Sequence, residues 1–255
     1  MITNILEPLV SERFRNDIHY RDGHLRVINA LPSRQVLGLH TPEMKQVAKS
    51  LSKNSGKEII RSFECTPNKN LCYEETLIWG FLINLERCSL DERFTMLNKY
   101  IPTLDNWAVC DAFCANAKWM GKADKETLWS FLQQWFGSAR EFEVRFAIVA
   151  SMSYFLNEEW IGRIFKRIDN LNFDSIESEY KSIKGKPLTA QKGTVQGEKP
   201  YYVRMGVAWL LATALAKFPE KTRAFVRLSE LPEDVVKLYI RKARESFRTR
   251  HIEAL

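Results

Sequence analysis

The sequence predicts an all-α protein, a curved solenoid of antiparallel helix pairs (an α-α superhelix), in one domain covering residues 1–255. Three observations predict this class. The chain has 255 residues, 45% hydrophobic and 27% charged, which is ample for a packed core. Only 11 glycines and 9 prolines interrupt it, so helix-forming residues dominate. Apolar stretches of helical length recur along the chain, and each is followed by an amphipathic stretch.

The first predicted helix covers residues 37–53. We expect Thr41 at its N-cap, because a threonine hydroxyl accepts a hydrogen bond from the free amides of the first turn. Pro42 then takes the first helical position, where its missing amide hydrogen is not needed.

Four helix pairs follow, each an apolar segment and an amphipathic partner, over residues 73–85 and 90–101, 106–119 and 124–136, 142–156 and 158–171, and 201–218 and 219–231. The apolar segments begin about 33, 36 and 60 residues apart, and the first two steps match a two-helix repeat. This spacing favours a right-handed stack of about six or seven HEAT-like pairs over a closed bundle. We expect the apolar helices to line one concave, basic face. A last helix within 231–250 ends strongly basic.

The third step is long because about 24 extra residues precede the last pair. Residues 173–200 supply them, and this inserted stretch has no helical period. Its composition suits either two short strands around a turn or a solvated loop.

Composition excludes several classes of protein. No apolar run approaches the ~20 residues of a membrane span, and the N-terminus lacks the pattern of a signal peptide, so we expect a cytoplasmic protein. The five cysteines form no CxxC pair, which favours small buried thiols in a reducing compartment over metal ligands. The four histidines are scattered, and no phosphate-binding loop, dinucleotide-binding motif or HExxH motif is present. We therefore expect no metal and no cofactor. The net charge of +7 favours a polyanionic partner.

Two tryptophans and an aspartate stand out in the apolar helices. Trp107 and Asp111 are four residues apart, so they lie on one helix face, one turn from each other. Trp209 is surrounded by small residues that let a ligand come close. Each indole is either part of the core or turned towards a ligand. An unpaired buried carboxylate is costly, so Asp111 is either ion-paired, with Arg145 as the candidate, or exposed for use.

Charge is otherwise rare in the two most apolar helices. Arg145 is the only charged residue of 144–156, and Arg204 the only one of 201–216. Such a guanidinium is either paired or reaching for water, or it faces a shared surface and binds phosphate.

A resemblance runs in order from about residue 35 to 250 and is carried by "LGLHTPEMKQVAK", "YEETLIWGFLI", "LDNWAVCDAFC", "EFEVRFAIV" and "YYVRMGVAWLLATALAKFPEKT". Together these stretches resemble the bacterial DNA alkylation repair proteins with HEAT-like repeats, the AlkD-like alkylpurine DNA glycosylases. The resemblance implies hydrolysis of the N-glycosidic bond of N3- or N7-alkylated purines without base flipping. It also implies alkylated double-stranded DNA as the partner, a monomer, and no membrane or nucleotide cofactor.

The site roles that the resemblance implies fall on particular residues. Trp107 and Trp209 hold the deoxyribose, Asp111 is the catalytic carboxylate, and Arg145 contacts phosphate. Alkylation leaves the purine cationic and a good leaving group, so the enzyme needs mainly to stabilise an oxocarbenium-like sugar and to guide water. Indole faces and a carboxylate do both. Two alternatives stay open: a non-catalytic DNA-binding paralogue that recognises damaged or branched DNA, and a protein-interaction scaffold.

The lysines of the inserted stretch are further candidates for DNA contact. Lys184, Lys186 and Lys192 are spread among glycines that allow tight turns. We expect either a solvated loop or a hairpin that contacts the DNA backbone, with Arg204 as a further phosphate contact.

Overall fold

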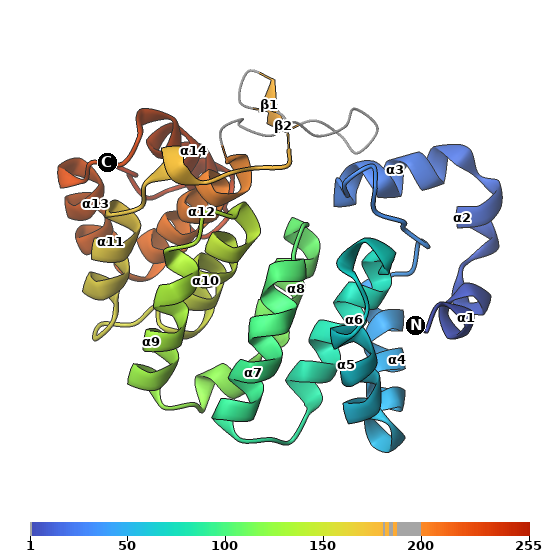
Figure 1. Ribbon diagram of the computed structural model, residues 1–255. Coiled ribbons are helices and arrows are strands. Elements are labelled where there is room, and N and C mark those ends of the chain that lie inside the picture. Colours follow the sequence, from blue (N-terminus) through green and yellow to red (C-terminus); the bar gives the residue numbers. More distant parts are fainter. Residues whose placement is uncertain (1, 181, 184–185, 188–199) are drawn as a thin grey trace. The chain divides into compact units, whose positions relative to one another are not determined.

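A computed structural model describes residues 2–180, 182–183, 186–187 and 200–255, and Figure 1 traces the chain through its helices. The described residues form fourteen α-helices, five short 3₁₀ helices and one pair of two-residue strands, which confirms the all-α prediction. Contacts within the chain group it into two compact units. The first unit holds Met1–Lys125 and Glu179–Gln196, and the second holds Glu126–Ser178 and Gly197–Leu255. A single domain over 1–255 stays a prediction.

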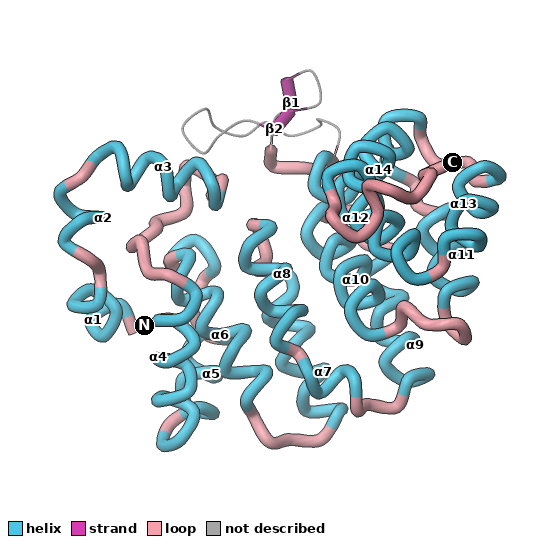
Figure 2. Tube along the Cα trace, turned by 180° about the vertical axis from the view of Figure 1, so that it is seen from behind, coloured by secondary structure: helices cyan, strands magenta, loops and turns pink. Residues whose placement is uncertain are grey.

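The first unit contains eight helices among its described residues. They are α1 (Thr3–Leu6), α2 (Glu12–Asn16), α3 (Ile18–Ile28), α4 (Thr41–Asn54), α5 (Gly56–Glu64), α6 (Tyr73–Leu85), α7 (Leu90–Tyr100) and α8 (Trp107–Asn116). Helix α6 packs between α4 and α8 in one layer, and α5 and α7 pack together in a second layer beside α6 (Figure 2). Consecutive helices thus alternate between two layers, which is the packing of an α-helical solenoid.

The second unit repeats this alternation. Its helices are α9 (Lys125–Phe136), α10 (Glu141–Tyr154), α11 (Ile161–Asp169), α12 (Tyr201–Lys217), α13 (Pro219–Leu228) and α14 (Glu233–Glu245). Helix α12 packs between α10 and α14. In the other layer Phe165 of α11 stacks on Phe225 of α13 with ring centroids 4.3 Å apart, and Arg163 of α11 pairs with Glu126 of α9.

The character of each layer follows from its residues. Helix α6 is buried from Tyr73 to Ile83, because it is apolar on every face and has helices on several sides. Its two charged residues, Glu74 and Glu75, stand in the first turn, where the helix dipole favours acids. Helices α5 and α11 instead have one apolar stripe and one exposed polar face. The spacing of apolar residues along the sequence therefore distinguishes the helices of one layer from those of the other.

Several predicted boundaries need correction. The N-cap of α4 is His40, with an extended backbone, and not Thr41; the His40 amide donates to Glu43 Oε2 at 2.8 Å. Helix α8 ends at Asn116 and not at residue 119, because a 3₁₀ turn over Lys118–Gly121 follows it. The other described 3₁₀ helices are Glu7–Leu9, Asn68–Asn70, Ile101–Thr103 and Phe173–Ser175.

The inserted stretch 173–200 begins as part of the core and not as a loop. Phe173, Ile176, Ser178 and Tyr180 are buried. The short strands β1 (Ser182–Ile183) and β2 (Lys186–Pro187) then pair in antiparallel, which agrees with the strand alternative. Residues 181, 184–185 and 188–199 lie outside the described part. None of the helices that the structure describes is both long and apolar enough to cross a membrane.

Candidate functional site

The candidate catalytic pair lies on the partly exposed edge of α8. Trp107, the first residue of the helix, and Asp111 are both half-buried. The opposite side of the helix is buried through Val109, Cys110, Phe113 and Cys114. The edge beside the pair carries only small side chains, those of Ala108, Ala112 and Ala115. The indole and the carboxylate thus lie on the same partly exposed edge of the helix.

The start of α8 is fixed by its N-cap residue, Asn106. Its side-chain oxygen accepts a hydrogen bond from the Ala108 amide at 2.8 Å, which satisfies a free donor of the first turn. Its side-chain nitrogen donates to the carbonyl oxygen of Ile28 at 2.9 Å. Asn106 is only 1% exposed, so both bonds are shielded from water. The end of α3 and the start of α8 are therefore tied together immediately before Trp107.

Trp209 belongs to the second unit and is the exposed large hydrophobic residue of α12. It is 38% exposed, whereas its neighbours Ala208 and Leu210 are buried. Thr213, one turn later, donates its hydroxyl to the Trp209 carbonyl oxygen at 2.8 Å. A large indole at the surface of a mostly buried helix offers a flat apolar face to a ligand.

The two arginines of the apolar helices are engaged inside the second unit. Arg145 is 3% exposed and donates to the Tyr202 carbonyl oxygen at 2.7 Å. Arg204 is 4% exposed, forms an ion pair with Asp234, and lies 5.1 Å from the centre of the Phe173 ring. These contacts agree with the interpretation of paired arginines. Phosphate contact by either residue stays a prediction.

The lysine predictions fall mostly outside the described residues. Lys184 and Lys192 are among the residues that the structure does not describe. Lys186 begins β2, and only its backbone is described. Their contact with DNA stays a prediction.

Buried carboxylates are among the polar residues that sequence analysis missed. Glu74 accepts hydrogen bonds from the amides of Leu37, Gly38 and Leu39, and burial raises the pKa of its carboxyl group. Glu75 accepts from the Ile2 amide at 2.8 Å and so anchors the N-terminal segment. A signal was present, because both acids open a helix that is otherwise apolar.

Glu141 has the same place in α10 and a more unusual environment. Its Oε1 accepts from the Tyr202 amide at 2.5 Å, and its Oε2 accepts from the Ser178 hydroxyl. Burial raises the pKa of Glu141 to about 7, and the hydrogen bonds and the charge of Arg145 oppose that shift only in part. One carboxyl group thus holds both Ser178, near the beginning of the inserted stretch 173–200, and the beginning of α12.

Comparisons with known proteins give the family. A search of curated proteins found no match, and neither did a search of solved structures. The family model described as "DNA alkylation repair enzyme" matches residues 22–183, which is more than half of the chain. That match includes α4 to α11 and the whole Trp107–Asp111 edge of α8. The chain belongs to the DNA alkylation repair enzyme family.

Proposed function

We propose that the protein removes N3- or N7-alkylated purines from double-stranded DNA by hydrolysing the N-glycosidic bond. Membership of the family supports DNA carrying alkylation damage as the substrate. The observation that carries the specific reaction is the pair Trp107 and Asp111, one turn apart on the accessible edge of α8. The net charge of +7 supports binding to a polyanion.

The reaction assigns a role to each side chain. Alkylation at N3 or N7 makes the purine cationic, so the bond breaks as positive charge moves to the sugar. The Asp111 carboxylate stabilises this charge and orients or deprotonates the attacking water. The indole faces of Trp107 and Trp209 favour a developing cation at the deoxyribose. A partly exposed helix edge is consistent with a damaged nucleotide that stays in the duplex, in contrast to enzymes that flip the base.

The DNA backbone needs cationic partners as well. We assign this role to Lys184, Lys186 and Lys192, whose side chains the structure does not describe. Arg145 and Arg204 join them if phosphate replaces their present partners, the Tyr202 carbonyl and Asp234.

The test is release of methylated purine from an alkylated duplex. Asp111→Asn should lower the release rate by about 10²-fold or more, because the charge that stabilises the sugar cation is lost. Duplex affinity should stay nearly unchanged, since a carboxylate contributes no attraction to phosphate. The matched control is Asp91→Asn, the same change at an exposed position of α7.

Three results would contradict the proposal in different ways. Equal release by wild type and Asp111→Asn removes Asp111 from the mechanism. Salt-dependent duplex binding without release favours the non-catalytic DNA-binding paralogue. No duplex binding at all favours a protein-interaction scaffold.

A further inference from the structure

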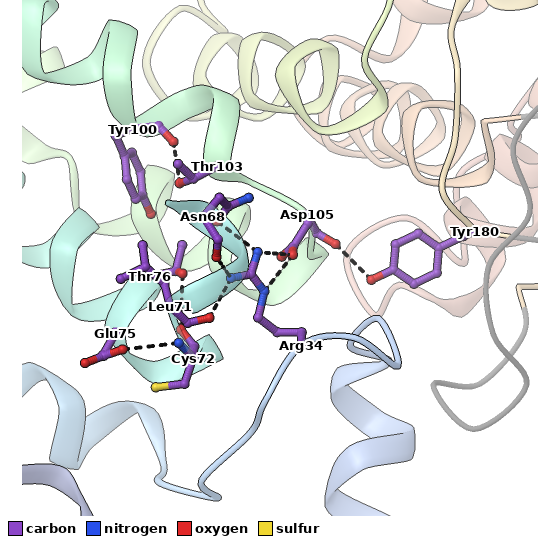
Figure 3. Close-up of polar contacts among 10 residues, drawn as sticks. All are labelled: Arg34, Asn68, Leu71, Cys72, Glu75, Thr76, Tyr100, Thr103, Asp105 and Tyr180. Atoms are coloured by element: carbon purple, nitrogen blue, oxygen red, sulfur yellow. Dashed lines mark hydrogen bonds and ion pairs between the residues drawn. The ribbon is translucent and has the colours of Figure 1, made fainter. Parts of the chain in front are cut away.

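The Arg34 guanidinium, in the loop between α3 and α4, has an acceptor for each of its five N–H groups (Figure 3). Nε donates to Asp105 Oδ2 at 2.8 Å, and one terminal nitrogen donates to the same oxygen. The remaining donors bind the carbonyl oxygens of Asn68 and Leu71, at 2.8 and 2.7 Å, and Asn68 Oδ1 at 2.9 Å. The side chain is only 6% exposed, so these bonds form largely out of contact with water.

Asp105 is held through its backbone as well as its side chain. The Tyr180 hydroxyl donates to the Asp105 carbonyl oxygen at 2.8 Å (Figure 3). The next residue is the N-cap Asn106, and the one after it is Trp107. Two consecutive residues before the candidate catalytic helix are thus fixed by named side-chain contacts.

The acceptors of Arg34 come from two different loops. Asn68 and Leu71 precede α6, whereas Asp105 precedes α8. One planar, rigid cation therefore sets the start of α8 relative to the start of α6, its neighbour in the layer. Hydrogen bonds to charged groups are stronger than neutral ones, and removing one partner leaves the others unsatisfied.

We propose that Arg34 is a positioning residue for the excision reaction. By holding Asp105 it fixes the first turn of α8, and so places the Trp107 indole and the Asp111 carboxylate against the sugar. This inference rests on the proposed glycosylase function. Small displacements suffice for an effect, because misplacing a reacting group by about 1 Å costs up to ~10²-fold in rate.

The first arm of the test compares Arg34→Lys with wild type. Lysine keeps the charge but has three donors on a single nitrogen, so it cannot reach both loops. Under single-turnover conditions with excess enzyme, the rate constant of methylpurine release should fall about tenfold to a hundredfold. The Kd for the duplex should stay within about twofold, because a purely positional change leaves phosphate contacts in place. The matched control, Arg61→Lys on the exposed side of α5, should behave as wild type.

Two further variants separate positioning from simple loss of stability. In Arg34→Ala, added guanidinium ion should restore part of the release rate by occupying the vacated position. Tyr180→Phe removes only the hydrogen bond to the Asp105 carbonyl and should lower the rate by less than Arg34→Lys does. All rates are compared well below the melting temperature of each variant.

The second arm is hydrogen exchange of the peptide covering residues 104–116. Exchange of the Ala108, Cys110 and Asp111 amides should be at least tenfold faster in Arg34→Lys and unchanged in Arg61→Lys. If Arg34→Lys releases methylpurine at the wild-type rate, the inference is overturned, whatever the exchange result. If the wild-type protein releases no methylpurine, the proposed function fails, and hydrogen exchange alone tests the anchoring role of Arg34. Unchanged exchange rates in Arg34→Lys overturn that role, and faster exchange confined to the start of α8 supports it.

Discussion

At the scale of single residues, Glu141 illustrates how burial of an acid makes the free energy of unfolding depend on pH. The folded pKa is about 7, above the ordinary 4.5. Between these two pH values the folded state keeps a proton that the unfolded state has released. The free energy of unfolding therefore falls as the pH rises from about 4.5 to 7 and levels off above 7. This group alone accounts for a loss of about 3 kcal/mol over that range.

Glu141→Gln tests this pH dependence. Glutamine keeps an acceptor for the Tyr202 amide and offers a donor to the Ser178 hydroxyl, but it does not titrate. Urea unfolding at several pH values from 5 to 8 should show a smaller decline in stability for the variant than for wild type. Parallel curves for the two proteins would show that another group causes the decline.

At the scale of elements, close packing of α6 against α7 depends on Gly80. A Cβ at this position would overlap the hydroxyl and ring of Tyr100 and come within 3.0 Å of the Phe113 ring. Trp79 and Tyr100 are fully buried, with ring centroids 5.3 Å apart, so neither has room to move. The glycine lets α6 approach Tyr100 at a position where helix propensity alone favours alanine.

Gly80→Ala should therefore lower the free energy of unfolding by about 1–3 kcal/mol, the usual cost of overpacking a core. Gly162→Ala in α11 is the matched control, because a Cβ there meets nothing within 4 Å. The control should gain up to about 1 kcal/mol from helix propensity. Urea unfolding of both variants measures the difference, and equal effects would contradict the packing argument.

At the scale of the whole molecule, the net charge of +7 predicts strongly salt-dependent binding to duplex DNA. Each phosphate neutralised adds roughly 0.9 to the magnitude of the log–log salt slope. Replacing residues 181–199 with a Gly/Ser linker should flatten that slope by about one to three units, if one to three of its lysines contact phosphate.

The linker variant should keep its fold, because the described anchors around the replaced stretch remain. Tyr180 still binds the Asp105 carbonyl, and Glu141 still holds Ser178 and Tyr202. Circular dichroism checks the fold, and titrations at several salt concentrations give the slope. An unchanged slope would instead favour the alternative, a solvated loop whose lysines do not contact DNA.

Hydrophobic periodicity is a local property, and it located the helices well. The prediction over 73–85 coincides with α6, Tyr73–Leu85, and the one over 90–101 exceeds α7 by a single residue. No helix was predicted at the positions of α1 to α3. Part of what holds this region lies far along the chain, since Glu75 binds the Ile2 amide. Spacing alone predicted that the candidate pair Trp107 and Asp111 shares one helix edge, and both lie partly exposed on α8.

The sequence by itself thus determined the all-α class, the helix pairs and the residues that share a helix face, because each depends on neighbours within one or two turns. Tertiary structure decided which charged side chains form ion pairs within the protein. Arg204 pairs with Asp234, and Arg34 meets Asp105 from 71 residues away. The partner of a buried charge is set by which helices pack together, and packing brings distant residues into contact that no local pattern encodes.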